Sequence, residues 1–361
     1  MDCPTFPELK YSEFGQRILA EIGNKRVPLM GSFELTYRCN LRCVHCYLDD
    51  QHNGVPGLQE LSFSEIRGIL DQIADAGCLW LLLTGGEPLV RPDFLDIYRY
   101  AKSKGFLVTL FTNGTLLTPE IADVLAEYKP FMVEVTLYGH TQETYERVTG
   151  IPGSHARCMR GIELLQERGI QFSLKTMVLT LNQDELADME AFAESLDVGF
   201  RFDPLVNAGM DGTHVPLTYR LSPGEIVNLD IAHPERMTEW RAFYDQHMPG
   251  FEHPGTRYVC AAGVRTFHID PYGQLGVCVL AREPAFNLRV GTFTEGWKIL
   301  GEIRFAPANS QTECYSCRLL PLCGSCPEWA QLEYGSGDGP VEFLCGVAQQ
   351  RARLLEKIVD S

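Results

Sequence analysis

The chain has 361 residues, of which 45% are hydrophobic and 22% are charged, and it carries a formal net charge of -16. This composition is typical of a folded globular protein, and the length allows one large domain beside a smaller one. The negative charge disfavours nucleic acid and anionic membranes as partners, because these polyanions attract clustered Lys and Arg. No run is apolar for long enough to span a bilayer, and the N-terminus lacks signal-peptide features, so we expect a cytoplasmic protein.

From about residue 33 to residue 204, short apolar runs alternate with helical stretches, a pattern that predicts βαβ units and a parallel sheet. Each run is nearly continuously apolar, as expected for a strand buried on both faces. Six strands are predicted, at residues 32–37, 79–85, 106–112, 131–137, 170–180 and 198–204. This repetition favours an α/β fold with a partial (β/α)6 barrel of the TIM type, and an open doubly wound sheet is the alternative.

Helix starts are predicted between these strands from N-cap patterns. They are Ser62 with Glu65, Asp93 after Pro92, and Thr118 before Pro119. Loops with unusual sequences, at residues 39–46, 84–88, 112–114 and 136–139, follow the first four strands. Because the carboxyl ends of parallel strands share one rim, we expect ligands to gather there.

The pattern changes after residue 205. We divide the chain into an N-terminal extension (1–31), the barrel core (32–210), a connecting helical segment (211–254) and a small C-terminal domain (255–361). Within the last, we predict a hairpin that turns at residues 271–273 and a closing helix at residues 346–360.

Thirteen cysteines are unusual for a cytosolic chain, where thiols stay reduced, and they indicate metal sites or catalysis. Three fall within residues 39–46 and seven lie from Cys260 to Cys345. The remaining three, Cys3, Cys78 and Cys158, are scattered, and we expect them to pack in the core or to stay as unligated thiols.

The first group, Cys39, Cys43 and Cys46, has the spacing CxxxCxxC. A zinc site would need a fourth ligand, for which His45 is the nearest candidate but is awkwardly placed beside Cys46. Three buried apolar cysteines are a weaker alternative, because polar residues separate them. An iron–sulfur cluster held by three thiolates leaves one iron open to a small-molecule ligand, which is a chemical reason to stop at three.

The order of two motifs, CxxxCxxC after the first strand and GGEP after the second, resembles the radical S-adenosylmethionine (radical SAM) superfamily. The resemblance implies that S-adenosylmethionine binds the open iron and is cleaved to methionine and a 5′-deoxyadenosyl radical, which takes a hydrogen atom from the substrate. It also implies that Gly85, Gly86, Glu87 and Pro88 form the site of the methionine amino group, with Glu87 accepting from the ammonium. Taken alone, these four residues fit a plain strand-to-helix turn.

The resemblance suggests further cofactor contacts. Thr136 stands where the family often has a Ser that contacts the ribose or carboxylate, and Tyr47 is placed to stack on adenine. The other candidates are Asn113, Lys175, Asn182 and Arg201. Each of these residues also has a structural alternative as a turn residue, a packed side chain or a satisfied interior polar group.

The cysteines of the tail resemble the SPASM extension of radical SAM enzymes, which carries two auxiliary four-iron clusters. The resemblance implies three [4Fe–4S] clusters in all, with the auxiliary ligands in two sets. Auxiliary cluster I would take Cys260, Cys278 and Cys326, and auxiliary cluster II would take Cys314, Cys317, Cys323 and Cys345. Set I lacks a fourth thiolate; His268 or Asp270 would fill the place, or it is open to substrate. Zinc ribbons remain an alternative for the CxxC pairs alone.

Enzymes with this extension modify ribosomally made peptides, so our leading hypothesis is a maturase that forms a thioether or carbon–carbon crosslink in a precursor peptide. The expected partners are a peptide or protein substrate, a separate leader-peptide-binding protein, and a reductant such as flavodoxin or ferredoxin.

Three alternatives remain open. One is a sulfatase-maturing enzyme that oxidises Cys or Ser to formylglycine, for which Asp203, Asp211 or Asp270 is a candidate general base. Another is tailoring of a small molecule or tetrapyrrole. A different class is a non-enzymatic iron–sulfur electron carrier, which would not need the GGEP loop.

Overall fold

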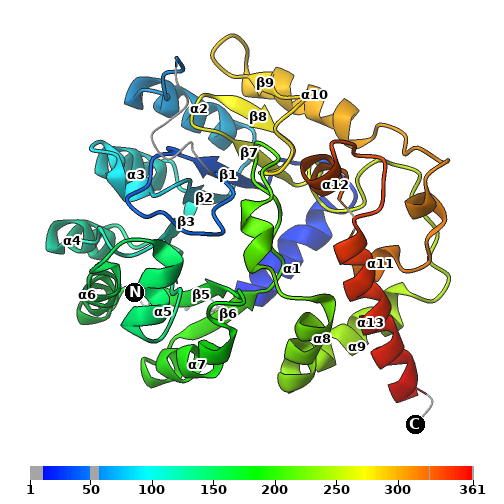
Figure 1. The fold of residues 1–361 in the computed structure, drawn as a ribbon. Coiled ribbons are helices and arrows are strands. Elements are labelled where there is room, and N and C mark those ends of the chain that lie inside the picture. Colours follow the sequence, from blue (N-terminus) through cyan, green and yellow to red (C-terminus); the bar gives the residue numbers. More distant parts are fainter. Residues whose placement is uncertain (1–10, 49–56, 325, 360–361) are drawn as a thin grey trace, which may run out of the picture.

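The computed structural model describes residues 11–48, 57–324 and 326–359. Its strands form one sheet, in the order β6-β5-β4-β3-β2-β1-β7-β8-β9 (Figure 1). They are β1 (Met30–Glu34), β2 (Trp80–Thr84), β3 (Leu107–Thr112), β4 (Met132–Thr136), β5 (Phe172–Met177), β6 (Gly199–Asp203), β7 (Thr266–Ile269), β8 (Gln274–Gly276) and β9 (Phe286–Asn287). All six predicted core strands are present, each shifted at one or both ends by one to three residues.

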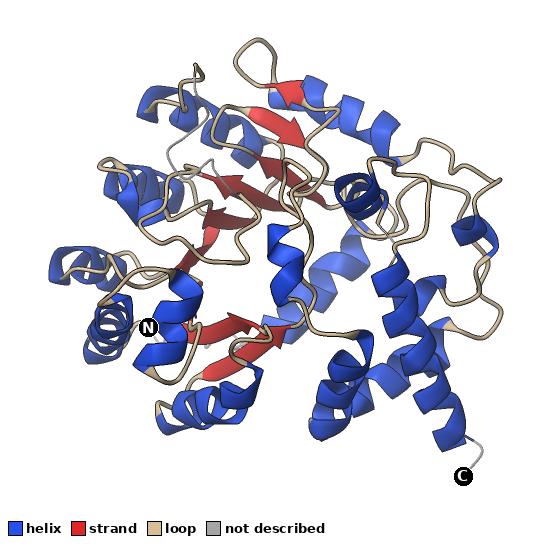
Figure 2. Ribbon diagram, viewed as in Figure 1, coloured by secondary structure: helices blue, strands red, loops and turns tan. Residues whose placement is uncertain are grey.

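The strand order of the sheet is that of a partial barrel that does not close. Strands β1 to β6 are all parallel, and each one pairs with its successor in the chain. A doubly wound sheet would reverse its order at a switch point, and no reversal occurs between these strands, so that alternative is wrong. Figure 2 shows the strands along an arc, with helices outside it.

The two faces of the sheet differ in burial, which corrects our expectation that both are buried. In β4, Val133 and Val135 point outward and are fully buried, whereas Glu134 and Thr136 point inward and are half-buried. The same alternation occurs in β2, β3 and β5. Because the arc does not close, its inner face is not filled by apolar side chains and keeps polar groups.

Helices cover the outer face of the arc and build the C-terminal part. They are α1 (Tyr11–Ile22), α2 (Phe63–Asp75), α3 (Phe94–Ser103), α4 (Pro119–Glu127), α5 (Gln142–Thr149), α6 (Ser154–Glu167), α7 (Leu186–Ser195), α8 (Pro223–Ala232), α9 (Pro234–His247), α10 (Phe293–Arg304), α11 (Leu320–Cys323), α12 (Pro327–Tyr334) and α13 (Glu342–Val359). In the described ranges, none of the helices combines the length and apolarity needed to cross a membrane.

The predicted helix starts are found, with one difference in mechanism. Ser62 and Glu65 form a complete capping box, and Thr118 accepts from the amide of Ile121. Asp93 makes no such cap bond, because its carboxylate pairs with Arg91 at 2.7 Å. The closing helix is also confirmed, as α13, within the described residues.

The tail joins the barrel sheet. The predicted hairpin forms β7 and β8, and β7 pairs in parallel with β1. Gly31 permits this, because a Cβ there would lie 2.4 Å from the ring of Phe267. Further along, α13 is fastened to α8 by Arg351, which pairs with the buried carboxylate of Asp230 at 2.7 Å. Barrel and tail therefore share one sheet and one hydrophobic core.

Candidate functional site

A cavity of about 550 Å³ opens on the inner face of the arc. This volume is within the usual range for small-molecule sites. Every parallel strand from β1 to β7 contributes to its wall, through Ser32, Leu82, Phe111, Thr136, Lys175, Arg201 and His268. The remaining side is lined by residues outside these strands, among them Leu205, Val206, Asn207, Met210, Val279, Leu280 and Trp329.

The three cysteines Cys39, Cys43 and Cys46 all line this cavity. Their loop is held against the C-terminal end of α5 by two backbone hydrogen bonds. The amide of Arg42 donates to the carbonyl of Thr149 at 2.8 Å, and that of Val44 donates to the carbonyl of Val148 at 3.0 Å. Burial raises the pKa of the Cys43 thiol well above its usual value, and the neighbouring Cys46 and Cys39 raise it further. Buried thiols keep their protons unless a cationic centre compensates, so the donor set fits a metal cluster.

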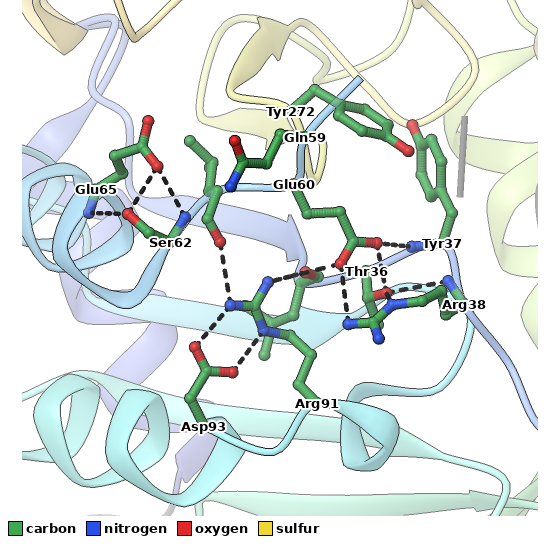
Figure 3. A network of polar contacts seen from close by, with 12 residues as sticks. Thr36, Tyr37, Arg38, Gln59, Glu60, Ser62, Glu65, Arg91, Asp93 and Tyr272 are labelled. Carbon is green, nitrogen blue, oxygen red and sulfur yellow. Dashed lines mark hydrogen bonds and ion pairs between the residues drawn. The ribbon is translucent and has the colours of Figure 1, made fainter. Parts of the chain in front are cut away.

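A polar network around Glu60 fixes the segment that leads into this loop (Figure 3). Glu60 accepts from the Thr36 hydroxyl at 2.6 Å and from the Tyr37 amide at 3.2 Å. Its other oxygen pairs with Arg38 at 3.1 Å. Arg91 donates to the carbonyls of Leu35 and Leu61 from behind, at 2.9 and 3.0 Å. The backbone before the first cysteine is thus held from both sides.

The GGEP loop packs directly on this segment. A Cβ on Gly85 would lie 2.2 Å from the carbonyl oxygen of Thr36, and one on Gly86 would lie 2.5 Å from that of Arg38. Gly85 also has a φ of 134°, which side chains disfavour. Both glycines line the cavity. They are therefore needed for the contact between the two motif loops, a role that the sequence did not reveal.

Glu87 has a different position from its two glycine neighbours, because it is fully buried and does not line the cavity. Its carboxylate accepts from the amides of Leu89 and Asn113 and from the Thr112 hydroxyl, at 3.1, 2.7 and 2.8 Å. Burial raises its pKa to about 7, although these donors oppose the shift. The carboxylate ties the ends of β2 and β3 together, with Pro88 opening the short turn that follows. Its contact with an ammonium stays a prediction.

The other predicted cofactor residues, Tyr47, Asn113, Thr136, Lys175 and Arg201, all line the cavity. Asn113 donates to the side-chain oxygen of Asn40 at 3.0 Å and reaches to 3.9 Å from the Cys39 sulfur, so it does more than form a turn. Asn182 does not line the cavity. Its side-chain amide instead forms hydrogen bonds with backbone groups of Leu179, Tyr138 and Met177.

Lys175 and Arg201 form a cationic pair on the cavity wall, and both contact the carboxylate of Glu134. Burial lowers the pKa of Lys175 well below its usual value. Its ammonium group also lies over the ring of Phe111. This wall can receive an anionic group, such as a carboxylate.

The candidate general bases fall into two classes. Asp203 lines the cavity, and its carboxylate accepts from the Leu205 amide at 2.8 Å. Asp270 does not line it, because its carboxylate accepts from the amides of Tyr272 and Gln274 in the hairpin turn. Asp211 likewise caps its own turn at Thr213. Of the three, the geometry favours Asp203.

The cysteines of the tail lie in two groups. The three thiols of set I interact electrostatically with one another; they are Cys260, Cys278 and Cys326. In set II, Cys345 interacts with each of the other three thiols, Cys314, Cys317 and Cys323. Backbone amides of Leu280 and Ala281 donate to the Cys278 sulfur, and those of Glu328 and Trp329 donate to Cys326.

Such N–H···S bonds are typical of iron–sulfur sites and tune their potential. In the ranges 11–48, 57–324 and 326–359, no three His, Cys, Asp or Glu side chains are grouped to hold a single metal ion. The thiols of each predicted set interact with one another. The assignment of the two sets to two clusters stays a prediction. Cys78 and Cys158 are buried as expected, and Cys3 lies outside the described residues.

His268 does not fit the open position of set I, which corrects one of our suggestions. Its Nδ1 lies 2.8 Å from the Ser32 hydroxyl and its Nε2 lies 3.0 Å from Glu34, so both nitrogens are occupied. Glu34 also accepts from Tyr47 and Arg282, both at 2.8 Å. Sequence reasoning missed this buried network, whose one available signal was a Glu inside an apolar strand.

Comparisons with known proteins identify the family of this chain. A sequence model of the radical SAM superfamily matches residues 33–194. The chain is 38% identical over 175 residues to an AdoMet-dependent heme synthase of Methanosarcina barkeri, a match to 48% of this chain and 50% of that protein. It is 30% identical over 311 residues to the mycofactocin maturase MftC of Mycobacterium ulcerans, a match to 83% of each chain.

The chain therefore spans about half the length of that heme synthase and most of that maturase. Among solved structures, it resembles Streptococcus suis SuiB bound to its precursor peptide SuiA, with a TM-score of 0.69 and 16% identity. That match covers 96% of this chain and 83% of SuiB. At such low identity the likeness shows the fold alone.

The Glu60 network predicts how firmly the cysteine loop is held. Glu60→Gln removes the negative charge that holds Arg38 and Arg91. A chelator should therefore extract iron from this loop about tenfold faster than from the wild type. That factor is the lower end of the loss in metal affinity seen when a group that orients metal ligands is removed. Glu120→Gln, on an exposed face, is the control and should not change the rate. Equal rates for all three proteins would show that the network does not support the loop.

The raised pKa of Glu87 predicts a pH dependence of stability. Between the reference value of 4.5 and the folded value of about 7, the folded chain binds more protons than the unfolded chain. This contribution is fully present below pH 4.5 and is lost as the pH rises through 7, in total roughly 3 kcal/mol at about 1.4 kcal/mol per pKa unit.

Urea midpoints measured from pH 5 to 8 should therefore fall more steeply for the native chain than for Glu87→Gln, whose side chain does not titrate. Only the slope is compared, because the amide also alters the hydrogen bonds. Parallel slopes would mean that Glu87 ionises normally.

Proposed function

Because the chain belongs to the radical SAM superfamily, we propose that it cleaves S-adenosylmethionine reductively and modifies a peptide, forming a thioether or carbon–carbon crosslink in a precursor. The observation that carries this proposal is the convergence of three thiols, the glycine turn and a wall of inward polar residues on one cavity. Superfamily membership favours an enzyme over an electron carrier.

Cys39, Cys43 and Cys46 would hold a four-iron cluster with one iron open in the cavity. When bound there, S-adenosylmethionine supplies a 5′-deoxyadenosyl radical that takes a hydrogen atom from the substrate. The chain's own residues then position the cofactor. The glycine turn supplies close backbone approach, Asn113 lies beside the first thiol, and Lys175 with Arg201 offers positive charge to a carboxylate.

Several observations support a peptide as the substrate. The maturase MftC is related to this chain over most of both lengths, and SuiB, which has the same fold, is solved with a precursor peptide. Sets I and II would hold two auxiliary clusters, which would accept the electron left when a crosslink forms. Auxiliary set I, with three thiols, would leave an iron for a substrate group.

Tailoring of a tetrapyrrole is the second candidate, and one specific observation favours it. The highest identity quoted above, 38%, is to a heme synthase, although it extends over only half of each chain. The apolar part of the cavity wall, which includes Leu82, Phe111 and Trp329, suits a flat ring as well as a peptide side chain.

Loss of one cysteine should separate the clusters. Cys43→Ala should abolish release of 5′-deoxyadenosine from enzyme, S-adenosylmethionine and dithionite under anaerobic conditions, while iron content falls by about one third, as expected for one cluster of three. Cys78→Ala, a buried thiol outside all three sets, should keep both. Loss of all iron in Cys43→Ala would contradict the partition of the cysteines.

A substrate panel tests the peptide proposal directly. Reduced enzyme with S-adenosylmethionine is incubated with the short peptides encoded beside its gene and, separately, with Fe-coproporphyrin III, and products are read by mass spectrometry. A peptide that loses two hydrogen atoms supports crosslinking. Decarboxylation of the porphyrin, or conversion of Cys or Ser to formylglycine, would replace the proposal with tetrapyrrole tailoring or sulfatase maturation.

A further inference from the structure

One side of the cavity contains a chain of hydrogen bonds that the proposed chemistry has not used. It runs from the hydroxyl of Ser32 to Nδ1 of His268 at 2.8 Å, and from Nε2 of His268 to the carboxylate of Glu34 at 3.0 Å. Ser32 and His268 both line the cavity. Glu34 lies behind them and is fully buried.

The charge of Glu34 sets the direction of these bonds. Burial alone would raise its pKa, but the guanidinium of Arg282 and the hydrogen bonds that the carboxylate accepts lower it to about 2, so Glu34 is a carboxylate that only accepts. His268 must then donate from Nε2, which leaves the lone pair of Nδ1 facing the Ser32 hydroxyl. Ser32 in turn presents its oxygen to the cavity.

The other groups around Glu34 keep it from taking a proton itself. Arg282 donates to the same carboxylate oxygen as His268, at 2.8 Å, and Tyr47 donates to the other oxygen. With both oxygens engaged by donors, Glu34 stays a carboxylate and fixes the orientation of the His268 ring. The acceptor at the end of the chain is therefore the imidazole, in the same role that a carboxylate-oriented histidine has in hydrolases.

We propose that Ser32 and His268, oriented by Glu34, form a proton relay that takes up the proton released from the substrate as the new bond forms. This inference rests on the proposed function. Ser32 lies on the barrel strand β1, and His268 lies opposite it on β7, the strand that the tail adds to the sheet. Ser32 and His268 are the catalytic residues of this step, and Glu34 is a positioning residue.

The balance of the step is simple. Joining a substrate group X–H to a carbon breaks the X–H and C–H bonds and forms X–C. The C–H hydrogen would leave as an atom to the radical that bound S-adenosylmethionine supplies. The remaining electron would be taken by an oxidised iron–sulfur cluster held by the cysteines of the chain. The proton of X–H would pass to the Ser32 oxygen as Ser32 gives its own proton to Nδ1 of His268, and His268 would later return that proton to solvent.

Ser32→Ala is the sharpest test, because it removes one half-buried hydroxyl on the cavity wall and leaves the buried charges in place. With the peptide that the wild-type enzyme modifies, the ratio of crosslinked product to 5′-deoxyadenosine should fall about 10²-fold, the lower range for acid–base catalysis. Binding of S-adenosylmethionine should be unchanged. Ser32→Thr, which keeps the hydroxyl, should restore the ratio. Ser173→Ala, on the inner face of β5 but outside the cavity wall, is the matched control.

A second measurement does not depend on turnover. In cluster-loaded enzyme labelled with ¹⁵N-histidine, one histidine should show an unprotonated, hydrogen-bonded Nδ1, and Ser32→Ala should shift that signal. A protonated Nδ1, or no shift in the variant, would overturn the relay. So would a wild-type ratio in Ser32→Ala, or a loss of product confined to Asp203→Asn, which would assign the base to Asp203. If the wild type cleaves S-adenosylmethionine yet modifies no peptide, the proposed function fails instead, and the relay with it.

Discussion

The contact between the exits of β1 and β2 is the constraint on which the site depends. The carbonyls of Thr36 and Arg38 accept from the amides of Gly86 and Glu87 at 2.8 and 2.9 Å. The two loops are so close that neither Gly85 nor Gly86 has room for a Cβ. Glu60 and Arg91 hold the same segment from its other side. Because this contact fixes both loops together, the thiols of one loop and the glycines of the other face a single cavity.

The unequal faces of the strands explain why that cavity is chemically rich. Outward residues pack under the helices and are fully buried, as Val133 and Val135 are in β4. Inward residues face an arc that never closes, and there the chain places Lys175, Arg201 and Asp203. A closed barrel would need apolar filling at these positions. The open arc exchanges that packing for a cavity whose wall keeps charged groups.

Docking of β7 beside β1 connects the tail to this site. It brings His268 and Arg282 onto Glu34, which also accepts from Tyr47 next to the third cysteine of the loop. One buried carboxylate therefore joins the loop of the first cluster motif to the region of auxiliary set I. Breaking such a buried charge network is costly, so it holds the tail and the barrel in one fixed arrangement, as the proposed electron and proton path between them would require.

The sequence by itself determined the six core strands and the spacing of the motifs, because these follow from local periodicity and from the chemistry of thiols. The two sets of tail cysteines came from the family resemblance that these motifs carry. It also placed Tyr47, Asn113 and Thr136 at the correct rim. Only the tertiary structure decided the open arc, the burial of Glu87 away from the cavity and the network of Glu34. Each of these depends on pairings between residues far apart in the chain, such as Ser32 with His268, and no local pattern encodes which distant strand completes a sheet.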